Sequence, residues 1–277
     1  RPEFTRIVAS AGWSYKWGVQ QRRSQHRIDL LDINYLYMPS IDSTFRKKYL
    51  EKDENYILKY NYEDRFIVRT GYSYIYNSAG RALMNNSGIG NSYTIRLNFE
   101  LAGNLLYAVA KLGGMKKNAL GEYTLLNIPF AQYLKGDFDF AKNLVIDNRN
   151  SLAFHFGAGI AIPYGNATML PFEKRYFSGG ANSVRGWSVR DLGPGSFPGD
   201  NNFMNQSGDI KLDASIEYRT RLFWKFRGAL FVDAGNIWTI RDYKDQPGGQ
   251  FKFDKFYKQI AVAYGLGLRL DLDFFVL

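Results

Sequence analysis

The sequence contains no cysteine and only two histidines among its 277 residues. The absence of cysteine excludes disulfide bonds and zinc–thiolate sites. The two histidines, His26 and His155, fall in different predicted hairpins, and neither has the convergent partners that a metal site or a histidine-based catalytic unit needs. We therefore expect neither a metal nor another cofactor, and no enzymatic chemistry.

Long apolar runs are also missing from the chain. No segment approaches the roughly 20 consecutive apolar residues that a membrane-spanning helix needs. A location in a membrane would therefore require a β-barrel, because helices and closed barrels are the structures that satisfy every backbone polar group inside lipid.

The chain carries an excess of positive charge, with a formal net charge of +10 and a pI near 9.5. This charge is spread along the sequence without a run rich in lysine or arginine. The pattern argues against a nucleic-acid partner and is compatible with anionic lipid or lipopolysaccharide. Lys111, Lys116 and Lys117 are candidates for contacts with lipopolysaccharide phosphates, and a solvated loop is the alternative.

Apolar and polar residues alternate in segment after segment. From Ile210 to Leu222 every second residue is apolar or interfacial, and the residues between them are almost all ionised. Side chains of a strand alternate between its two faces, and the sequence offers no helical layer to cover the apolar faces. The pattern favours a barrel with lipid outside and a polar lumen inside. A soluble all-β protein is the alternative.

We therefore predict an all-β fold, an antiparallel transmembrane β-barrel, with nine strands and the beginning of a tenth. The predicted strands span residues 3–18, 26–38, 62–77, 91–102, 127–142, 150–163, 208–222, 226–239, 259–271 and 273–277.

The predicted connections alternate between short turns and long loops, as in outer-membrane barrels, whose short turns face the periplasm. Two long loops are predicted to contain short helices, at Ser43–Lys52 and Gly103–Leu112. The second segment is amphipathic, so it either lies on the barrel rim or packs as plain loop. The long connections lie near residues 39–61, 103–126, 164–207 and 240–258.

Aromatic and acidic residues of the predicted strands agree with a barrel. Aromatic residues make up 17% of the chain, an enrichment that suits the girdles at the two lipid–water interfaces. Asp137 and Asp139 share one face of a strand, so we interpret them as lumen-facing polar residues and not as catalytic carboxylates. Four tryptophans near predicted strand ends are interpreted as interfacial anchors: Trp13, Trp17, Trp224 and Trp238.

The longest predicted connection, residues 164–207, contains the motif Phe177-Ser178-Gly179-Gly180-Ala181-Asn182-Ser183-Val184-Arg185-Gly186-Trp187. Its three glycines allow a positive φ and a close approach of the backbone. A loop of this length with little regular structure is normally either functional or disordered. Apolar residues such as Val184 and Trp187 argue against disorder, so we expect the loop to pack inside the lumen.

An arginine at the tip of such a loop needs acceptors. Glu217 lies on the predicted strand 208–222, and Asp233 lies in the segment Phe231-Val232-Asp233-Ala234-Gly235. Both carboxylates are expected to face inward from adjacent strands. A guanidinium can bridge two carboxylates, and Gly235 is expected to leave space for the incoming loop. A solvated Arg185 is the alternative.

These segments resemble two motifs of the BamA/TamA outer-membrane assembly superfamily. The segment from Gly179 to Trp187 resembles the sixth extracellular loop, which enters the lumen, and Phe231–Gly235 resembles the second barrel motif, whose Asp receives the loop Arg. Glu217 matches the acidic residue on the strand after that loop. The whole sequence is similar to the TamA-like lipoprotein barrel of Bacteroidota. The resemblance implies a lumen loop motif made of Gly179, Gly180, Val184, Arg185, Gly186 and Trp187, with Asp233 and Glu217 as acceptors.

The resemblance also implies an architecture and a function. Members of the family are 16-stranded barrels, so residues 1–277 would form one outer-membrane β-barrel domain with about 10 of the 16 strands. The N-terminal strands, the last strand and the periplasmic POTRA repeats would lie outside this sequence. The implied function is insertion, assembly or translocation of proteins at the bacterial outer membrane, without catalysis. A two-partner secretion transporter and a passive porin-like channel are the alternatives.

The partners implied by the resemblance are of three kinds. The barrel would contact outer-membrane lipid and lipopolysaccharide. It would also act on unfolded β-barrel client proteins. POTRA domains and periplasmic or inner-membrane accessory proteins would complete the assembly.

Overall fold

The computed structural model describes residues 4–19, 23–43, 46–50, 56–79, 91–199, 205–270 and 272. No helix in these ranges is both long and apolar enough to cross a membrane. The elements are β1 (Phe4–Val19), β2 (Ser24–Ile41), the π-helix η1 (Arg46–Leu50), α2 (Tyr56–Asn61), β3 (Arg65–Asn77), β4 (Ser92–Ala102), α4 (Asn104–Leu112), β5 (Thr124–Leu125), β6 (Ile128–Pro129), β7 (Tyr133–Val145), β8 (Asn150–Pro163), the 3₁₀ helix η2 (Phe172–Lys174), β9 (Ile210–Arg221), β10 (Phe226–Trp238), the 3₁₀ helix η3 (Phe256–Gln259) and β11 (Ala261–Leu270).

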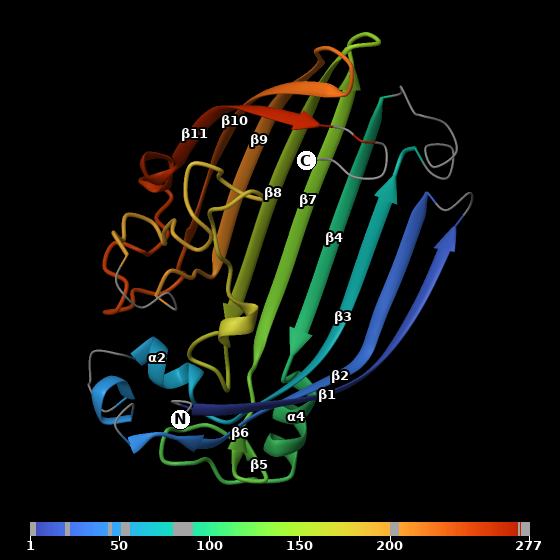
Figure 1. Ribbon diagram of the computed structural model, residues 1–277. Coiled ribbons are helices and arrows are strands. Elements are labelled where there is room, and N and C mark those ends of the chain that lie inside the picture. Colours follow the sequence, from blue (N-terminus) through green and yellow to red (C-terminus); the bar gives the residue numbers. More distant parts are fainter. Residues whose placement is uncertain are drawn as a thin grey trace.

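Nine strands form one antiparallel sheet in the order β1-β2-β3-β4-β7-β8-β9-β10-β11. The sheet is strongly curved, and the connection between β8 and β9 lies on its concave side (Figure 1). The predicted all-β antiparallel barrel architecture is confirmed. Within the described residues β1 and β11 remain at opposite ends of the strand order, so this part of the barrel is not closed.

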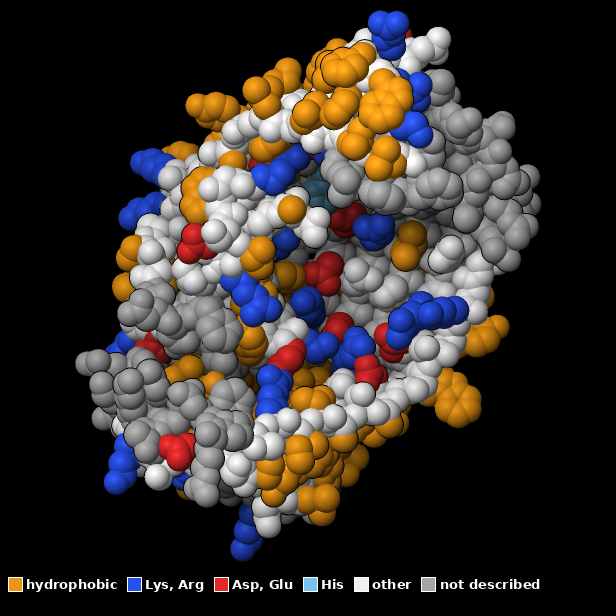
Figure 2. Space-filling model, viewed as in Figure 1, with side chains coloured by type: hydrophobic (Ala, Val, Ile, Leu, Met, Phe, Trp, Pro, Cys, Tyr) orange, Lys and Arg blue, Asp and Glu red, His pale blue; other side chains and the backbone are white. Residues whose placement is uncertain are grey.

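The sheet exposes its apolar side chains on the outer face and buries charged side chains on the inner face, the reverse of a soluble protein. Tyr264 and Leu266 on β11 are 84% and 81% exposed, whereas Glu217 on β9 and Asp233 on β10 are 5% and 0% exposed. Figure 2 shows lysine, arginine and acidic side chains gathered in the hollow, and apolar side chains around the outside. Because a bilayer replaces the second protein layer, the apolar face needs no cover from the chain itself.

The two ends of the sheet differ as predicted. Short turns at residues 146–149 and 222–225 connect β7 to β8 and β9 to β10 at one end. The helices α2 and α4 and the β5–β6 hairpin gather at the opposite end (Figure 1). The loops pack on one another there, through a buried cluster that comprises Ile57, Tyr60, Met169 and Tyr243. In bacterial outer-membrane barrels the short turns are those that face the periplasm.

Some predicted bounds need correction. The predicted helix at Gly103–Leu112 is confirmed as α4, and the one at Ser43–Lys52 corresponds to the π-helix η1 where the structure describes it. The strand predicted at 127–142 begins at Tyr133, because Leu126 and Asn127 adopt positive φ values of 51° and 64° and form the turn between β5 and β6. The helix α2 was not predicted, and the strand start predicted at 273–277 lies outside the described residues.

Trp238 is not an interfacial anchor, contrary to the prediction. Its side chain is completely buried, and its Nε1 donates a hydrogen bond to Oε1 of Gln259 at 2.8 Å. The rings of Phe251 and Phe256 make edge contacts with it. The long loop after β10 therefore folds over this end of the strand and encloses the tryptophan.

Candidate functional site

The connection between β8 and β9 folds into a compact tip. Ser178 and Leu192 form a bridge across it, and the N–H of Gly180 donates to the carbonyl oxygen of Trp187 at 2.8 Å. Gly179 and Gly180 adopt positive φ values of 98° and 85°, as the sequence suggested. A Cβ at Gly179 would collide with the carbonyl oxygen of Ser188, so this turn requires glycine.

Apolar residues dock the tip against β11. Val184 is completely buried and forms a cluster with Leu192 and Ala263, against which Trp187 packs. Gly186 does not adopt a positive φ, so that part of the expectation was wrong. Its small size matters instead for the approach to β11, since a Cβ at this position would lie 2.8 Å from the Cβ of Ala263.

The docked tip places Arg185 between two acidic residues of the wall. Its Nε and Nη2 donate to Oδ2 and Oδ1 of Asp233, each at 2.7 Å, and its Nη1 donates to Oε2 of Glu217 at 2.5 Å. Its backbone N–H also donates to Oδ2 of Asp233, at 3.1 Å. The hydrogen bonds that the guanidinium donates to Asp233, and then the one to Glu217, raise the pKa of Arg185. The structure thus brings the predicted arginine and both predicted acceptors together; we call these three residues the clasp.

The clasp extends into two arginines that the sequence analysis did not single out. Nε of Arg219 and Nη2 of Arg269 each donate to Oε1 of Glu217 at 2.7 Å. Glu217 therefore binds three guanidinium groups, one of them through its other oxygen. Alternation along β9 and β11 places Glu217, Arg219 and Arg269 on the lumen face. The sequence pattern could therefore have predicted that these two arginines lie near Glu217.

Phe231 has a direct role beside the clasp. The guanidinium carbon of Arg185 lies 3.5 Å from the centre of the Phe231 ring, a cation–π arrangement. The opposing residue on β11 is Gly265, and a Cβ there would lie 2.7 Å from the ring. Gly265 therefore leaves the space that the ring occupies beneath the arginine.

Gly235 does not make room for the loop, contrary to expectation. A Cβ at Gly235 would meet the backbone of β9, at 2.7 Å from the carbonyl oxygen of Leu212 and 3.1 Å from Cα of Asp213. The absence of a side chain therefore allows β9 and β10 to approach closely next to Asp233.

A second anchor, missed in the sequence, fixes the start of the same loop. The hydroxyl of Tyr176 donates to Oδ1 of Asp137 at 2.6 Å, and its ring covers Gly159 on β8. Nζ of Lys174 lies 2.7 Å from Oε1 of Glu100 on β4. The loop is thus tied to the wall at β4, β7 and β8 as well as at β9 and β10.

Between these two contacts, Arg175 turns away into the protein. Its side chain is fully buried and donates to the carbonyl oxygen of Ser207 at 3.1 Å and to Oε1 of Gln246 at 3.2 Å. Its Nε lies 3.5 Å from Oδ1 of Asp209, which is also fully buried. Burial raises the pKa of Asp209 despite the neighbouring guanidinium. Three consecutive residues therefore hold the loop to three different parts of the molecule.

The site is a mechanical arrangement of ion pairs and packing. Among the described residues, no three His, Asp or Glu side chains are placed to hold one metal ion. His155 lies 2.6 Å from Asp139 and 3.4 Å from Asp213, each on a neighbouring strand, so it joins the charged lining of the lumen. What this arrangement can do is fix a long loop against one wall of a barrel.

An outward apolar face, a charged lumen and a loop anchored in that lumen define an outer-membrane β-barrel protein with an internal loop. The chain matches the Omp85 superfamily domain over residues 2–277. It belongs to the Omp85 superfamily, whose members are outer-membrane proteins of assembly and transport.

Individual relatives cover parts of the chain. A stretch of 96 residues is 32% identical to the outer membrane protein assembly factor BamA of Neisseria meningitidis serogroup B, covering 31% of this chain and 12% of that protein. A stretch of 146 residues is 27% identical to the sorting and assembly machinery component 50 homolog A of Xenopus laevis, covering 50% of this chain and 30% of that protein. The chain thus spans less than a third of the length of these relatives.

One solved structure has a similar fold. The crystal structure of BamA from Haemophilus ducreyi lacking POTRA domains 1–3 matches with a TM-score of 0.60 and 18% sequence identity. The match covers 97% of this chain and 49% of that chain. At this identity the likeness concerns the fold alone.

Proposed function

We propose that this chain is the membrane-embedded part of a bacterial outer-membrane protein that inserts, assembles or translocates other polypeptides. The observation that carries the proposal is the clasp, which holds the 164–207 connection against the lumen wall in a chain of the Omp85 superfamily. The names of its relatives, an assembly factor and a sorting and assembly component, support the same class of activity.

In the proposed mechanism the loop stiffens one side of the barrel. Its contacts reach from Glu100 on β4 to Ala263 on β11, so the strands between them are braced together. The barrel then opens at a seam elsewhere, where an unpaired strand edge offers N–H and C=O groups to a strand of the client. The clasp residues Arg185, Asp233 and Glu217 act as structural residues, and no bond is made or broken.

The proposed partners follow from this mechanism. Unfolded β-barrel proteins would be the clients, and POTRA domains with periplasmic or inner-membrane accessory proteins would deliver them. At the loop end, α4 exposes Leu105, Val109 and Leu112 at helical spacing, with Lys111 also exposed. An exposed apolar stripe with a basic neighbour suits the interface of a membrane that carries lipopolysaccharide.

The proposal is tested by client folding. The full-length protein is reconstituted in liposomes, a urea-denatured β-barrel client is added, and its folding is followed by heat-modifiable mobility in electrophoresis. We expect faster client folding than in empty liposomes, and a several-fold loss with Arg185→Ala but not with Lys252→Ala, a change in an exposed loop residue. Equal client folding with and without the protein would overturn the proposal.

The same preparation separates the alternatives. Accumulation of a soluble polypeptide in a protease-protected space would favour a two-partner secretion transporter. A large, steady conductance in planar bilayers would favour a porin-like channel. The clasped loop supports neither a wide nor a permanently open lumen.

A further inference from the structure

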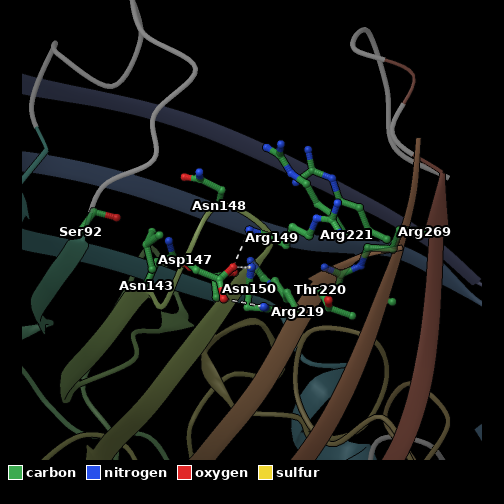
Figure 3. A pocket seen from close by; sticks show the side chains of 14 residues that line it. Ser92, Asn143, Asp147, Asn148, Arg149, Asn150, Arg219, Thr220, Arg221 and Arg269 are labelled. Atoms are coloured by element: carbon green, nitrogen blue, oxygen red, sulfur yellow. Dashed lines mark hydrogen bonds between the residues drawn. The ribbon is translucent and has the colours of Figure 1, made fainter. Parts of the chain in front are cut away.

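A cavity of about 360 Å³ opens at the short-turn end of the sheet, lined by residues of β4 and of β7 to β11. In Figure 3 the side chains of Arg149, Arg219, Arg221 and Arg269 gather at the strand ends that border it. Arg227 completes a set of five lining arginines. We call these five residues the arginine rim.

The acidic residue in the cavity lining does not neutralise the rim. Asp147 is the one acidic residue among the described residues that line the cavity. Its Oδ2 accepts from the side chain of Asn150 at 2.7 Å, and its Oδ1 accepts from the backbone N–H groups of Arg149 and Asn150 at 2.7 and 2.9 Å. These hydrogen bonds, that from the Asn150 side chain first, lower the pKa of Asp147. Its carboxylate thus serves the turn between β7 and β8.

Like charges face each other across the strands of the rim. Arg227 on β10 is directly opposite Arg221 on β9 and directly opposite Arg269 on β11. Like charges in directly opposed positions destabilise a sheet. A guanidinium binds carboxylates and phosphates with paired hydrogen bonds, so this row of three arginines suits an anionic group.

The arginines of the rim differ in their contacts with acidic residues that the structure describes. Arg219 and Arg269 share one oxygen of Glu217. By contrast, the exposed guanidinium groups of Arg149 and Arg221 have no carboxylate within 4.0 Å in the part of the chain that the structure describes. Among the described residues, the cavity lining therefore carries five arginines and one aspartate next to the lumen.

We propose that the arginine rim binds an acidic segment of a client polypeptide at the periplasmic mouth of the barrel. The inference rests on the proposed function, since it takes the occupant to be a client. Between the arginines the cavity offers amide and hydroxyl groups that suit a peptide backbone, from Asn143, Asn148 and Ser151.

The geometry favours a polypeptide over a lipid headgroup. Arg219, Arg221 and Arg269 occupy alternate positions of their strands, on the same lumen-facing side as Glu217. The opposite side of these strands carries exposed leucines, Leu222 and Leu268 among them. Lipid therefore meets the leucines, whereas a chain that enters the lumen meets the arginines.

Peptide binding tests the inference. The full-length protein in zwitterionic detergent is titrated into a fluorescent ten-residue peptide rich in Asp and Glu, or into its Asn/Gln counterpart, and anisotropy is measured. We expect the acidic peptide to bind at least about tenfold more tightly, with an affinity that falls as salt screens the charges. The double variant Arg149→Gln/Arg221→Gln should weaken binding of the acidic peptide about tenfold.

The matched control removes the same charge at the other end of the sheet. Lys252 and Lys255 are exposed in the long loop after β10, and Lys252→Gln/Lys255→Gln should leave the affinity unchanged. Equal binding of the two peptides, or an equal loss in both double variants, would overturn the inference. So would a rim variant that keeps the peptide and loses binding to phosphatidylglycerol vesicles, because the site would then serve lipid.

Failure of this inference is distinguishable from failure of the proposed function. The same rim variant is also measured in the client-folding assay. Normal client folding by a protein that does not bind the acidic peptide would reject the rim as a client site and leave the proposed function standing. Peptide binding without any client folding would reject the proposed function and would leave the rim as a binding site for an acidic peptide that is not a client.

Discussion

Arg185 and Asp233 are 48 residues apart in the sequence and share three hydrogen bonds, two from the guanidinium and one from the backbone N–H. Asp233 is completely buried, and Arg185 is the arginine that the motif loop brings to it. Removing one member of a buried pair typically costs about 3–5 kcal/mol, because the other charge is left without a partner. The position of the loop tip therefore depends on this pair.

The first prediction concerns release of the loop tip. Arg185→Ala should leave the barrel folded and raise cleavage by trypsin after Arg190 about a hundredfold or more, since cleavage follows the open population when reclosing is fast. Asp233→Asn keeps one of the two acceptor oxygens and should have a smaller effect. Heat-modifiable mobility reports the barrel, and Lys252→Ala is the control. A wild-type cleavage rate in Arg185→Ala would contradict the role of the clasp.

The second prediction concerns the anchor at Tyr176. A Cβ at Gly159 would lie 2.6 Å from the Tyr176 ring, so Gly159→Ala should displace this ring and expose the start of the loop to protease. Tyr176→Phe removes only the hydroxyl, which donates to Oδ1 of Asp137 at 2.6 Å and to the carbonyl oxygen of Gly136 at 3.4 Å, and should cost about 1–2 kcal/mol. Gly136→Ala, whose Cβ would make an ordinary 3.6 Å contact with Phe99, is the control. Equal protection in both glycine variants would show that this anchor does not hold the loop.

The sequence predicted the clasp because its geometry follows from short-range rules. Strand alternation decides that Glu217 and Asp233 face inward, and adjacent strands bring them to one stretch of wall. Among the arginines of the 164–207 connection, Arg185 is selected by the resemblance of its motif to a loop that enters the lumen. None of these steps requires knowledge of the path that the loop takes.

The contacts that sequence reasoning missed depend on that path. The pairs Lys174–Glu100 and Tyr176–Asp137 join loop residues to β4 and β7, which lie well before the loop in the sequence. Gly159 alternates with the apolar residues of its strand and so falls on the lumen face, which was the available signal. Likewise Trp238 looked like an interfacial residue, because nothing in its own strand indicates that the following loop covers it.

The third prediction concerns the ring beneath Arg185. Gly265→Ala places a methyl group 2.7 Å from the Phe231 ring, which must then move toward the guanidinium. We expect loop cleavage to increase, and Phe231→Leu in the same chain to restore part of the protection by freeing the space. Gly267→Ala lies two residues further along β11, where a Cβ would make a 3.6 Å contact with Ala229, and should be neutral. Failure of Phe231→Leu to restore any protection would argue that Gly265 matters for another reason.

The fourth prediction tests the orientation of the wall with two adjacent residues of β4. Leu97 is the middle residue of the strand and is 41% exposed on the apolar face, whereas Asn98 faces the lumen opposite Asp137. Leu97→Arg should lower the free energy of unfolding in liposomes by about 2–4 kcal/mol, the usual cost of a cation on a lipid-facing strand near the bilayer midplane. Asn98→Arg places the new cation opposite Asp137 and should change the free energy of unfolding by less than about 1 kcal/mol. Guanidinium chloride titrations of folding give both values. Because the two substitutions introduce the same charge at the same depth, equal losses would mean that both faces of this strand meet the same medium, which is incompatible with a barrel that has lipid on one side and an aqueous lumen on the other.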